Sequence, residues 1–228
     1  MTRTPILLSF EEYLNHDDGT DTRYELANGE LIEMPPATRR HRRIAKFLEK
    51  LFEREIERLR LPWETGRGDV EIATQRATQT RRPDVVVFER NELDPDEVDI
   101  LTTPPLLVVE VVSPGEKNAE RDYVTKEAEY SEFGVREYWT ADRGAETPNI
   151  TVRTLVGDKY ETRIFTGNQQ IVSRVFPELV LTAEQILSEH SGRVRTPPLQ
   201  GGHETRLKGI NPFVFLDGKF PTKRDIIL

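Results

Sequence analysis

Two short aliphatic segments of this sequence each contain one carboxylate where a buried strand normally has none. The first segment, RRPDVVVF, places Asp84 directly before a run of valines, and the second, PLLVVEVVS, places Glu110 inside one. Aliphatic runs of this length are typical of strands that are buried on both faces of a sheet. An ionised carboxylate there costs several kcal/mol unless a partner compensates it. Two of them in one sheet favour a shared cation, and metal-assisted chemistry is the leading interpretation.

Each of the two acids also has an ordinary structural explanation. Asp84 follows a proline, and an aspartate in such a place can cap a loop. Glu110 shares a strand face with Val108 and Val112, because side chains alternate along a strand. It would be solvated if its strand lay at the edge of the sheet.

Three further side chains could complete a site. Lys126 is expected on the helix that follows the second strand, on the same helical face as Asp122. It is an ordinary surface salt bridge unless that face turns toward the sheet, where its ammonium could help hold an attacking water. Glu25 and Glu30 belong to an expected hairpin near the N-terminus, and either could add a carboxylate.

The composition limits the kind of metal site. The 228 residues include no cysteine, which excludes disulfides, thiol nucleophiles and cysteine-type zinc or iron–sulfur sites. The four histidines (His16, His41, His190 and His203) are scattered without metal-ligand spacing. Oxygen ligands are therefore expected, and these favour magnesium, manganese or calcium. No apolar stretch is long enough to span a bilayer or form a signal-peptide core, so a cytoplasmic protein without a membrane partner is expected.

The charge distribution is uneven. The net charge of −8 counts against a general nucleic-acid binder, since phosphate contacts come from lysine and arginine. The basic residues are nevertheless dense at positions 39–43 and 81–82, and a local patch can bind a polyanion on an acidic protein. The candidates for nucleic-acid binding are Arg39, Arg40, His41, Arg43 and Arg82. The alternative is a solvated helix face.

The order of the expected elements indicates a mixed α/β domain over residues 1–190. Capping boxes and hydrophobic periodicity predict helices over 9–15, from Thr38 to about residue 60, over 119–133 and over 183–190. Strands are expected over 24–27 and 30–34 around an Asn-Gly turn, over 63–74, 85–88, 106–113 and 135–141, and in a hairpin over 150–165. Residues 91–105 are expected to form a loop. Residues 191–228 are predicted to be a linker and tail, disordered or docked on a partner.

These features together resemble a known group of proteins. A strand headed by Pro-Asp, a strand with a central glutamate and a helix behind it are similar to the PD-(D/E)XK nuclease superfamily. More narrowly, the chain resembles the Uma-type restriction endonuclease family of bacterial proteins. The matching segments are YELANGELIEM, TRRHRRIAKFLEKL, RRPDVVVF, LLVVEVVSPG, DYVTKEAEY, GVREYW and IVSRVFPELVL, which span roughly residues 9–188.

The resemblance implies a restriction-endonuclease-like mixed central sheet flanked by helices, with an added C-terminal β-hairpin. It implies that Asp84 and Glu110 are the two motif acids. The superfamily pattern has lysine two residues after the second acid, and this chain has Val112 there. In the Uma-type family the lysine is placed on the following helix, which points to Lys126, and Glu25 is preferred over Glu30 as an additional acid.

The resemblance thus implies a Mg²⁺- or Mn²⁺-dependent endonuclease acting on DNA, which often works as a homodimer. Asp84, Glu110 and the carbonyl of Val111 would hold the ion. Lys126 would orient the attacking water, and Glu25 would assist. Two alternatives stay open: a nuclease fold without catalysis that acts as a nucleic-acid-binding or regulatory module, which Val112 favours, and a metal-independent hydrolase that uses Asp84 and Glu110 as an acid/base pair.

Overall fold

The computed structural model describes residues 7–20, 22–74, 79–90, 99–113, 115 and 120–188. All of these residues lie in the first of two compact units, residues 1–197. The tail predicted over residues 191–228 lies outside the described residues. In chain order the described elements are α1 (Phe10–Leu14), β1 (Tyr24–Ala27), β2 (Glu30–Glu33), α2 (Arg39–Leu59), β3 (Trp63–Gly66), β4 (Glu71–Ala73), β5 (Thr80–Arg81), β6 (Val85–Glu89), β7 (Ile100–Leu101), β8 (Leu107–Val111), η1 (Arg121–Thr125), α4 (Lys126–Phe133), β9 (Glu137–Asp142), β10 (Asn149–Val156), β11 (Lys159–Thr166) and α5 (Ala183–Leu187).

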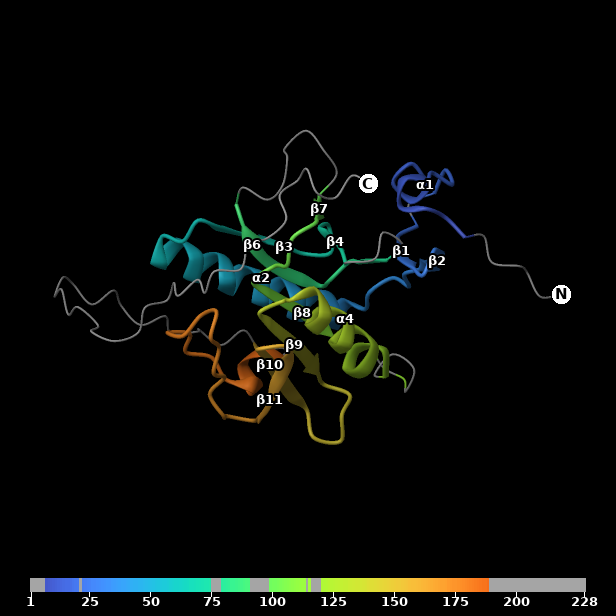
Figure 1. Ribbon diagram of the computed structural model, residues 1–228. Coiled ribbons are helices and arrows are strands. Elements are labelled where there is room, and N and C mark those ends of the chain that lie inside the picture. Colours follow the sequence, from blue (N-terminus) through green and yellow to red (C-terminus); the bar gives the residue numbers. More distant parts are fainter. Residues whose placement is uncertain are drawn as a thin grey trace. The chain divides into compact units, whose positions relative to one another are not determined.

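A mixed six-stranded sheet forms the centre of the described residues, in the order β11-β10-β9-β8-β6-β3 (Figure 1). Only β8 and β9 are parallel among its pairs, and the chain crosses between them through η1 and α4. The hairpin of β10 and β11 extends the sheet at one edge. This confirms the predicted fold class, including the C-terminal hairpin.

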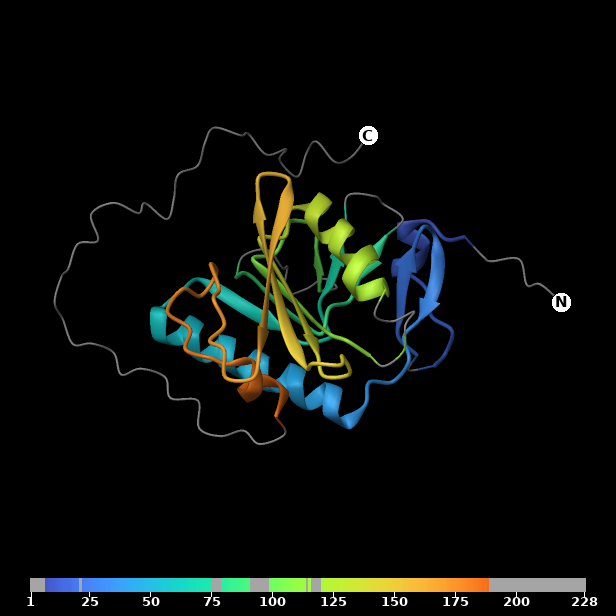
Figure 2. The same cartoon turned by 90° about the horizontal axis from the view of Figure 1, so that it is seen from below.

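Helix α2 covers one face of this sheet (Figure 2). It begins where the Thr38 side chain accepts a bond from the His41 N–H, and it ends at Arg60, which has left-handed backbone angles. Ile44, Leu48 and Phe52 recur at helical spacing and pack on the sheet and on α5. The periodicity that predicted this helix therefore also identified its buried face.

The opposite face is covered by α4 (Figure 2). Tyr130 and Phe133 of this helix pack on Val86 and Val108 of β6 and β8. Side chains alternate along a strand, so Glu110 points to the same side as Val108, toward α4. The acid therefore enters a layer that is otherwise apolar.

Two local predictions have opposite outcomes. The hairpin is confirmed, because Asn28 and Gly29 both have positive φ, at 52° and 85°, as a tight hairpin turn requires. The strand predicted over residues 63–74 is wrong as one piece, because the chain bends at 67–69, where the Asp69 carboxylate accepts the Arg67 N–H. The bend brings Val70 so close to Gly66 that a Cβ atom on residue 66 would overlap the Val70 side chain.

Two further segments differ from the expectation. The segment predicted as a loop over residues 91–105 contains β7, which pairs in parallel with β4, while residues 91–98 lie outside the described part. The described part of the helix predicted over 119–133 starts with a π-helical turn, η1, before α4. Within the described ranges, no helix has the length and apolar character needed to cross a bilayer.

Candidate active site

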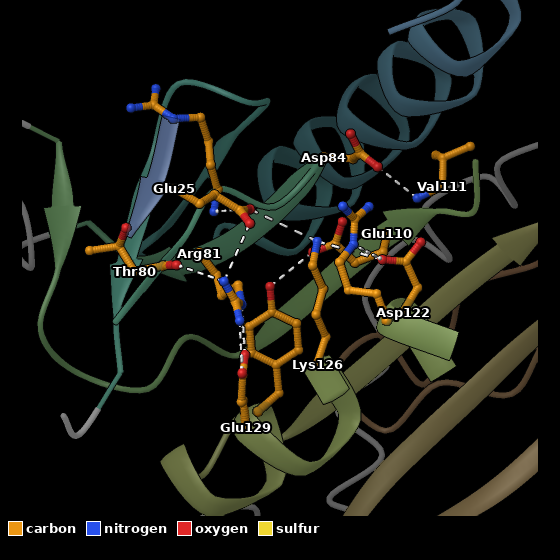
Figure 3. A network of polar contacts seen from close by, with 12 residues as sticks. Glu25, Thr80, Arg81, Asp84, Glu110, Val111, Asp122, Lys126 and Glu129 are labelled. Atoms are coloured by element: carbon orange, nitrogen blue, oxygen red, sulfur yellow. Dashed lines mark hydrogen bonds and ion pairs between the residues drawn. The ribbon is translucent and has the colours of Figure 1, made fainter. Parts of the chain in front are cut away.

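Asp84 lies directly before β6, opposite Glu110 on the neighbouring strand. The antiparallel pairing matches Val85 with Val109, and the same register continued by one residue places Asp84 against Glu110. Opposite residues of paired strands have Cβ atoms about 5 Å apart. The Oδ2 atom of Asp84 also accepts a bond from the main-chain N–H of Val111 at 2.7 Å (Figure 3). The structure therefore brings the two acids to adjacent positions of one sheet.

Glu110 is buried in the interior of that sheet. Its strand lies between β6 and β9 and its residue is 4% exposed, so the alternative of a solvated sheet edge is wrong. The Tyr130 hydroxyl donates to Oε1 at 2.9 Å, and Lys126 Nζ lies 2.8 Å from the same oxygen. Both of these contacts with described residues are made by Oε1. Two protein groups thus orient this carboxylate through one of its oxygens.

Lys126 reaches the acids from the start of α4 (Figure 3). Its residue is 2% exposed, so the alternative of an ordinary surface salt bridge is wrong. Besides Glu110, its Nζ lies 3.7 Å from Asp122 Oδ1 and 4.0 Å from Glu25 Oε1. A lysine on the helix after β8 therefore occupies a position from which it can balance three carboxylates.

The two N-terminal glutamates are separated clearly by the structure. Glu25 is 4% exposed on β1, and its Oε1 accepts the Arg82 N–H at 3.0 Å. Its Oε2 lies 3.4 Å from Arg81 Nη1. Glu30, on β2, is exposed to solvent. Of the two candidates, Glu25 is the one at the site.

Asp122 is a buried acid that the sequence had only placed beside Lys126. It lies in η1, is 2% exposed, and its Oδ1 accepts from Arg121 Nε at 3.3 Å. Its main-chain carbonyl accepts from the Tyr138 hydroxyl at 2.6 Å. Short π-helical turns often occur at functional sites, and this one directs an acid inward. The spacing of four residues from Lys126 was the only sequence signal for it.

Arg81 belongs to the basic pair at 81–82, of which the sequence analysis made only Arg82 a candidate. Arg81 donates to both carboxylate oxygens of Glu129, at 2.6 and 2.8 Å, and so connects β5 to α4 (Figure 3). It also contacts Glu25. A planar guanidinium suits such a two-bond contact, which fixes the helix that carries Lys126.

Burial and charge shift the pKa values of the central pair. Burial raises the pKa of Glu110 to about 8; Lys126 opposes this effect, while Asp84, Asp122 and Glu25 reinforce it. Burial alone would lower the pKa of Lys126, but the carboxylates of Glu110, Glu25 and Asp122 outweigh it and raise that pKa above its ordinary value. The carboxylates therefore favour the charged form of Lys126, while burial favours the neutral form of Glu110.

His41 contacts the site, although the sequence had grouped it with the nucleic-acid-binding arginines. Its Nε2 lies 2.6 Å from Asp84 Oδ1, across 43 residues of sequence. Burial would lower the pKa of His41, but the bond to Asp84 and the charges of Asp84, Glu110 and Asp122 raise it. The imidazole therefore favours its charged form and holds one Asp84 oxygen in a fixed orientation.

We expect His41→Gln to lower the activity of this site about 10- to 100-fold, the usual cost of removing a group that orients a ligand. The matched control is His16→Gln, because His16 is exposed and packs edge-on against Tyr24 outside the site. Comparison of turnover by both variants with that of the unmodified protein checks the prediction. If the two variants are equally active, His41 does not contribute to the activity of this site.

The residues present suit a hard cation that keeps some of its own water. Among the described side chains, no three carboxylates or imidazoles are arranged to hold a metal ion by themselves. Mg²⁺ does not need such a group, because it commonly binds through one or two carboxylates together with waters and phosphate oxygens. Asp84, Glu110 Oε2 and the Val111 carbonyl are oxygen donors of that kind. Burial raises the pKa of Glu110, so further positive charge beside this carboxyl would favour its ionised form.

The remaining predicted residues fall into two places. Arg39, Arg40 and Arg43 line a cleft together with His41. Arg82 does not line this cleft; its guanidinium is paired with the buried Glu71. The sequence placed all of these basic residues in one candidate set, whereas the fold separates Arg82 from the others.

Comparison with known proteins adds a family and a fold. The model of the family Uma2, described as "Putative restriction endonuclease", matches residues 10–184. A solved structure from Anabaena variabilis, described as a "putative nuclease belonging to DUF820", is similar with a TM-score of 0.63 at 16% identity, over 79% of this chain and 97% of that one. Among curated proteins no match was found. At this identity the solved structure supports the fold alone.

Proposed function

Because this chain belongs to the Uma2 family, we propose that it is a divalent-metal-dependent endonuclease that hydrolyses phosphodiester bonds in DNA. The description of the family supports a nuclease, and the chemistry of the site supports the metal. Cutting of both strands by nucleases of this fold class often uses a dimer with two sites, so the proposal includes a homodimer.

The observation that carries this proposal is the convergence of Asp84 and Glu110. The two acids lie opposite each other on paired strands, and Lys126 lies 2.8 Å from Glu110. Glu110 is buried and Asp84 is half-buried, and two carboxylates at opposite strand positions repel each other, so an arrangement without further positive charge is unfavourable. Two carboxylates that can hold a divalent ion, with an ammonium beside them, suit metal-assisted hydrolysis of a phosphodiester.

The roles of the acids follow from their contacts. Asp84 and Glu110 would hold the ion together with the Val111 carbonyl, and the bound ion would polarise the phosphate and lower the pKa of a water. His41 and the Val111 N–H orient the Asp84 carboxylate. Tyr130 orients that of Glu110 through Oε1.

Lys126 has two roles in the proposed reaction. It balances Glu110 before substrate binds, and its ammonium is a donor for the attacking water or for the charge that develops on the phosphate. Glu25 and Asp122 lie 4.0 and 3.7 Å away and hold the lysine between them. Lys126 thus supplies the charge that the superfamily pattern places two residues after the second acid, where this chain has Val112.

The test is cleavage of a labelled DNA duplex by protein that has been treated with EDTA and dialysed. Cleavage is expected only after Mg²⁺ or Mn²⁺ is added back. Nicked and linear products distinguish cutting of one strand from cutting of both. DNA that stays intact with either ion, over a range of sequences, would contradict the proposal and favour a binding module.

One observation favours a second candidate, a metal-independent hydrolase. With its pKa raised to about 8, Glu110 holds a proton near neutral pH and could act as an acid beside Asp84. The positive charge of Lys126 opposes the protonation of Glu110 that this role requires. Activity that persists in excess EDTA would favour this candidate.

Binding of the ion can be tested without any substrate. We expect Mn²⁺ at 100 times its dissociation constant to stabilise the EDTA-treated protein by about 2.7 kcal/mol, because it binds the folded state alone. Glu110→Gln should abolish this gain, and Glu30→Gln should retain it, since Glu30 is an exposed acid. Thermal unfolding with and without Mn²⁺ measures the difference. Stabilisation of both variants to the same extent would place the ion elsewhere.

A further inference from the structure

A basic cleft opens between the N-terminus of α2 and the ends of β8 and β9. Its volume is about 580 Å³. Arg39, Arg40 and Arg43 lie on the helix side, and Arg143 lies on the strand side, where the chain leaves β9. No acid is among the described residues that line it. Four arginines without a carboxylate among the described lining residues favour a positive local potential on a chain whose net charge is −8.

The start of α2 is unusual for a helix. Acids are favoured in the first turn because they offset the positive end of the helix dipole, and α2 has none there. Its first turn instead contains Arg39, Arg40 and His41. Like charges added to a positive helix end lower stability unless an anion offsets them. The same turn therefore combines outward-facing main-chain N–H groups with guanidinium groups, a combination that suits a phosphate.

This basic character is local. A second cleft, of about 550 Å³, lies at the other end of α2. Its lining includes Glu53, Glu57 and Glu64 as well as Arg60 and Arg90. Arginine in that cleft is mixed with acid, as on an ordinary solvated surface. The two clefts thus differ in charge although they are similar in volume, which makes the second one an internal reference.

The basic cleft is continuous with the candidate active site. His41 lines the cleft and lies 2.6 Å from Asp84. Val111 also lines the cleft and donates its N–H to the same carboxylate. A chain molecule lying in the cleft therefore passes beside the two residues that contact the Asp84 carboxylate.

Arg143 stands on the far wall of this cleft. Its Nη1 donates to the Leu187 carbonyl at 2.7 Å, which anchors the guanidinium between the end of β9 and α5. The sequence did not single it out, because it stands alone after its strand, far along the chain from the arginines of α2. Only the folded sheet brings the two groups to one cleft.

We propose that this cleft holds the phosphodiester backbone of one nucleic-acid strand, with Arg39, Arg43 and Arg143 contacting the phosphates next to the one that lies at Asp84. The inference deepens the proposed function and rests on it for the position of the cut. One guanidinium group can donate two parallel hydrogen bonds to a phosphate. The two walls of the cleft place such groups on both sides of a nucleic-acid strand that lies between them. Contacts of this kind position the backbone and carry no base sequence.

The test measures binding in EDTA, where no cutting occurs. Fluorescence anisotropy is recorded with labelled duplex DNA, single-stranded DNA and single-stranded RNA of one sequence at several salt concentrations. The double variant Arg39→Ala/Arg43→Ala is expected to bind about tenfold or more weakly to the probe for which the unmodified protein has the highest affinity. It should also reduce the dependence of log K on log salt by about one unit for each lost contact. Arg143→Lys, which keeps the charge, should weaken binding less.

Arg90→Ala is the matched control, since Arg90 lies in the second cleft in an exposed pair with Glu64. It should bind like the unmodified protein. If the double variant keeps the affinity and salt dependence of the unmodified protein, or loses no more than Arg90→Ala, the cleft does not hold the strand. The proposal is equally overturned if the unmodified protein binds none of the three probes at low salt.

The two proposals fail in different ways. Binding that depends on these arginines, without cutting in Mg²⁺ or Mn²⁺, supports the cleft and contradicts the nuclease. If cleavage depends on Asp84 but the affinity for nucleic acid is unchanged in the arginine variants, the nuclease proposal is supported and the proposal for the cleft is contradicted. The probe that loses most affinity in the double variant identifies the type of strand.

Discussion

Asp84→Asn and Glu110→Gln are each expected to lower metal-dependent cleavage about a thousandfold or more. Each change removes one negative oxygen ligand while keeping the shape of the side chain. A bound ion contributes several kcal/mol to stabilising the transition state, and every 1.36 kcal/mol lost is about tenfold in rate. Single-turnover cleavage at saturating protein measures the chemical step apart from binding.

Two exposed glutamates, one on β6 and one on the hairpin of β1 and β2, provide the controls for this experiment. Glu89 is the exposed last residue of β6, and Glu30 is exposed on β2, so Glu89→Gln and Glu30→Gln should cut within about twofold of the unmodified protein, as surface changes usually have little effect. Circular dichroism shows whether each variant is folded. If folded Asp84→Asn and Glu110→Gln variants cut as fast as the controls, these acids do not form the active site.

Lys126→Met is expected to lower the free energy of unfolding by about 3–5 kcal/mol, because it leaves buried carboxylates without their partner. Glu110, Glu25 and Asp122 all lie within 4.0 Å of the lysine nitrogen. Lys50→Met is the control, since Lys50 is exposed on α2 and should change stability by no more than about 0.5 kcal/mol. Urea denaturation measures both variants.

The double variant Lys126→Met/Glu110→Gln separates the loss of the pair from the loss of one partner. Removing both charges leaves fewer uncompensated groups, so the double variant should be more stable than the sum of the single effects predicts, by about 0.5–3 kcal/mol. Its cleavage should nevertheless stay as low as that of Glu110→Gln. Strictly additive losses of stability would show that the two side chains are not coupled.

Local patterns were sufficient for most of the elements. The capping boxes at Ser9 and Thr182 mark where α1 and α5 begin, because each is a set of contacts within four residues. The Asn28-Gly29 turn and the apolar face of α2 are likewise short-range patterns. The prediction of one strand over residues 63–74 was wrong, because the alternation of apolar and charged residues continues through the bend. The close approach of Val70 to Gly66 is visible only in the folded protein.

The aliphatic neighbours of Asp84 and Glu110 can be read directly from the sequence, which places one acid at the head of an apolar strand and the other inside one. The groups that contact these acids come from distant parts of the chain, so only the folded protein reveals them. His41 reaches Asp84 across 43 residues, and Arg143 comes to the cleft of α2 from the end of β9. Sheet register and helix docking set these distances, and neither is encoded in the spacing of neighbouring residues. Local chemistry therefore identifies the acids, and only packing assigns their partners.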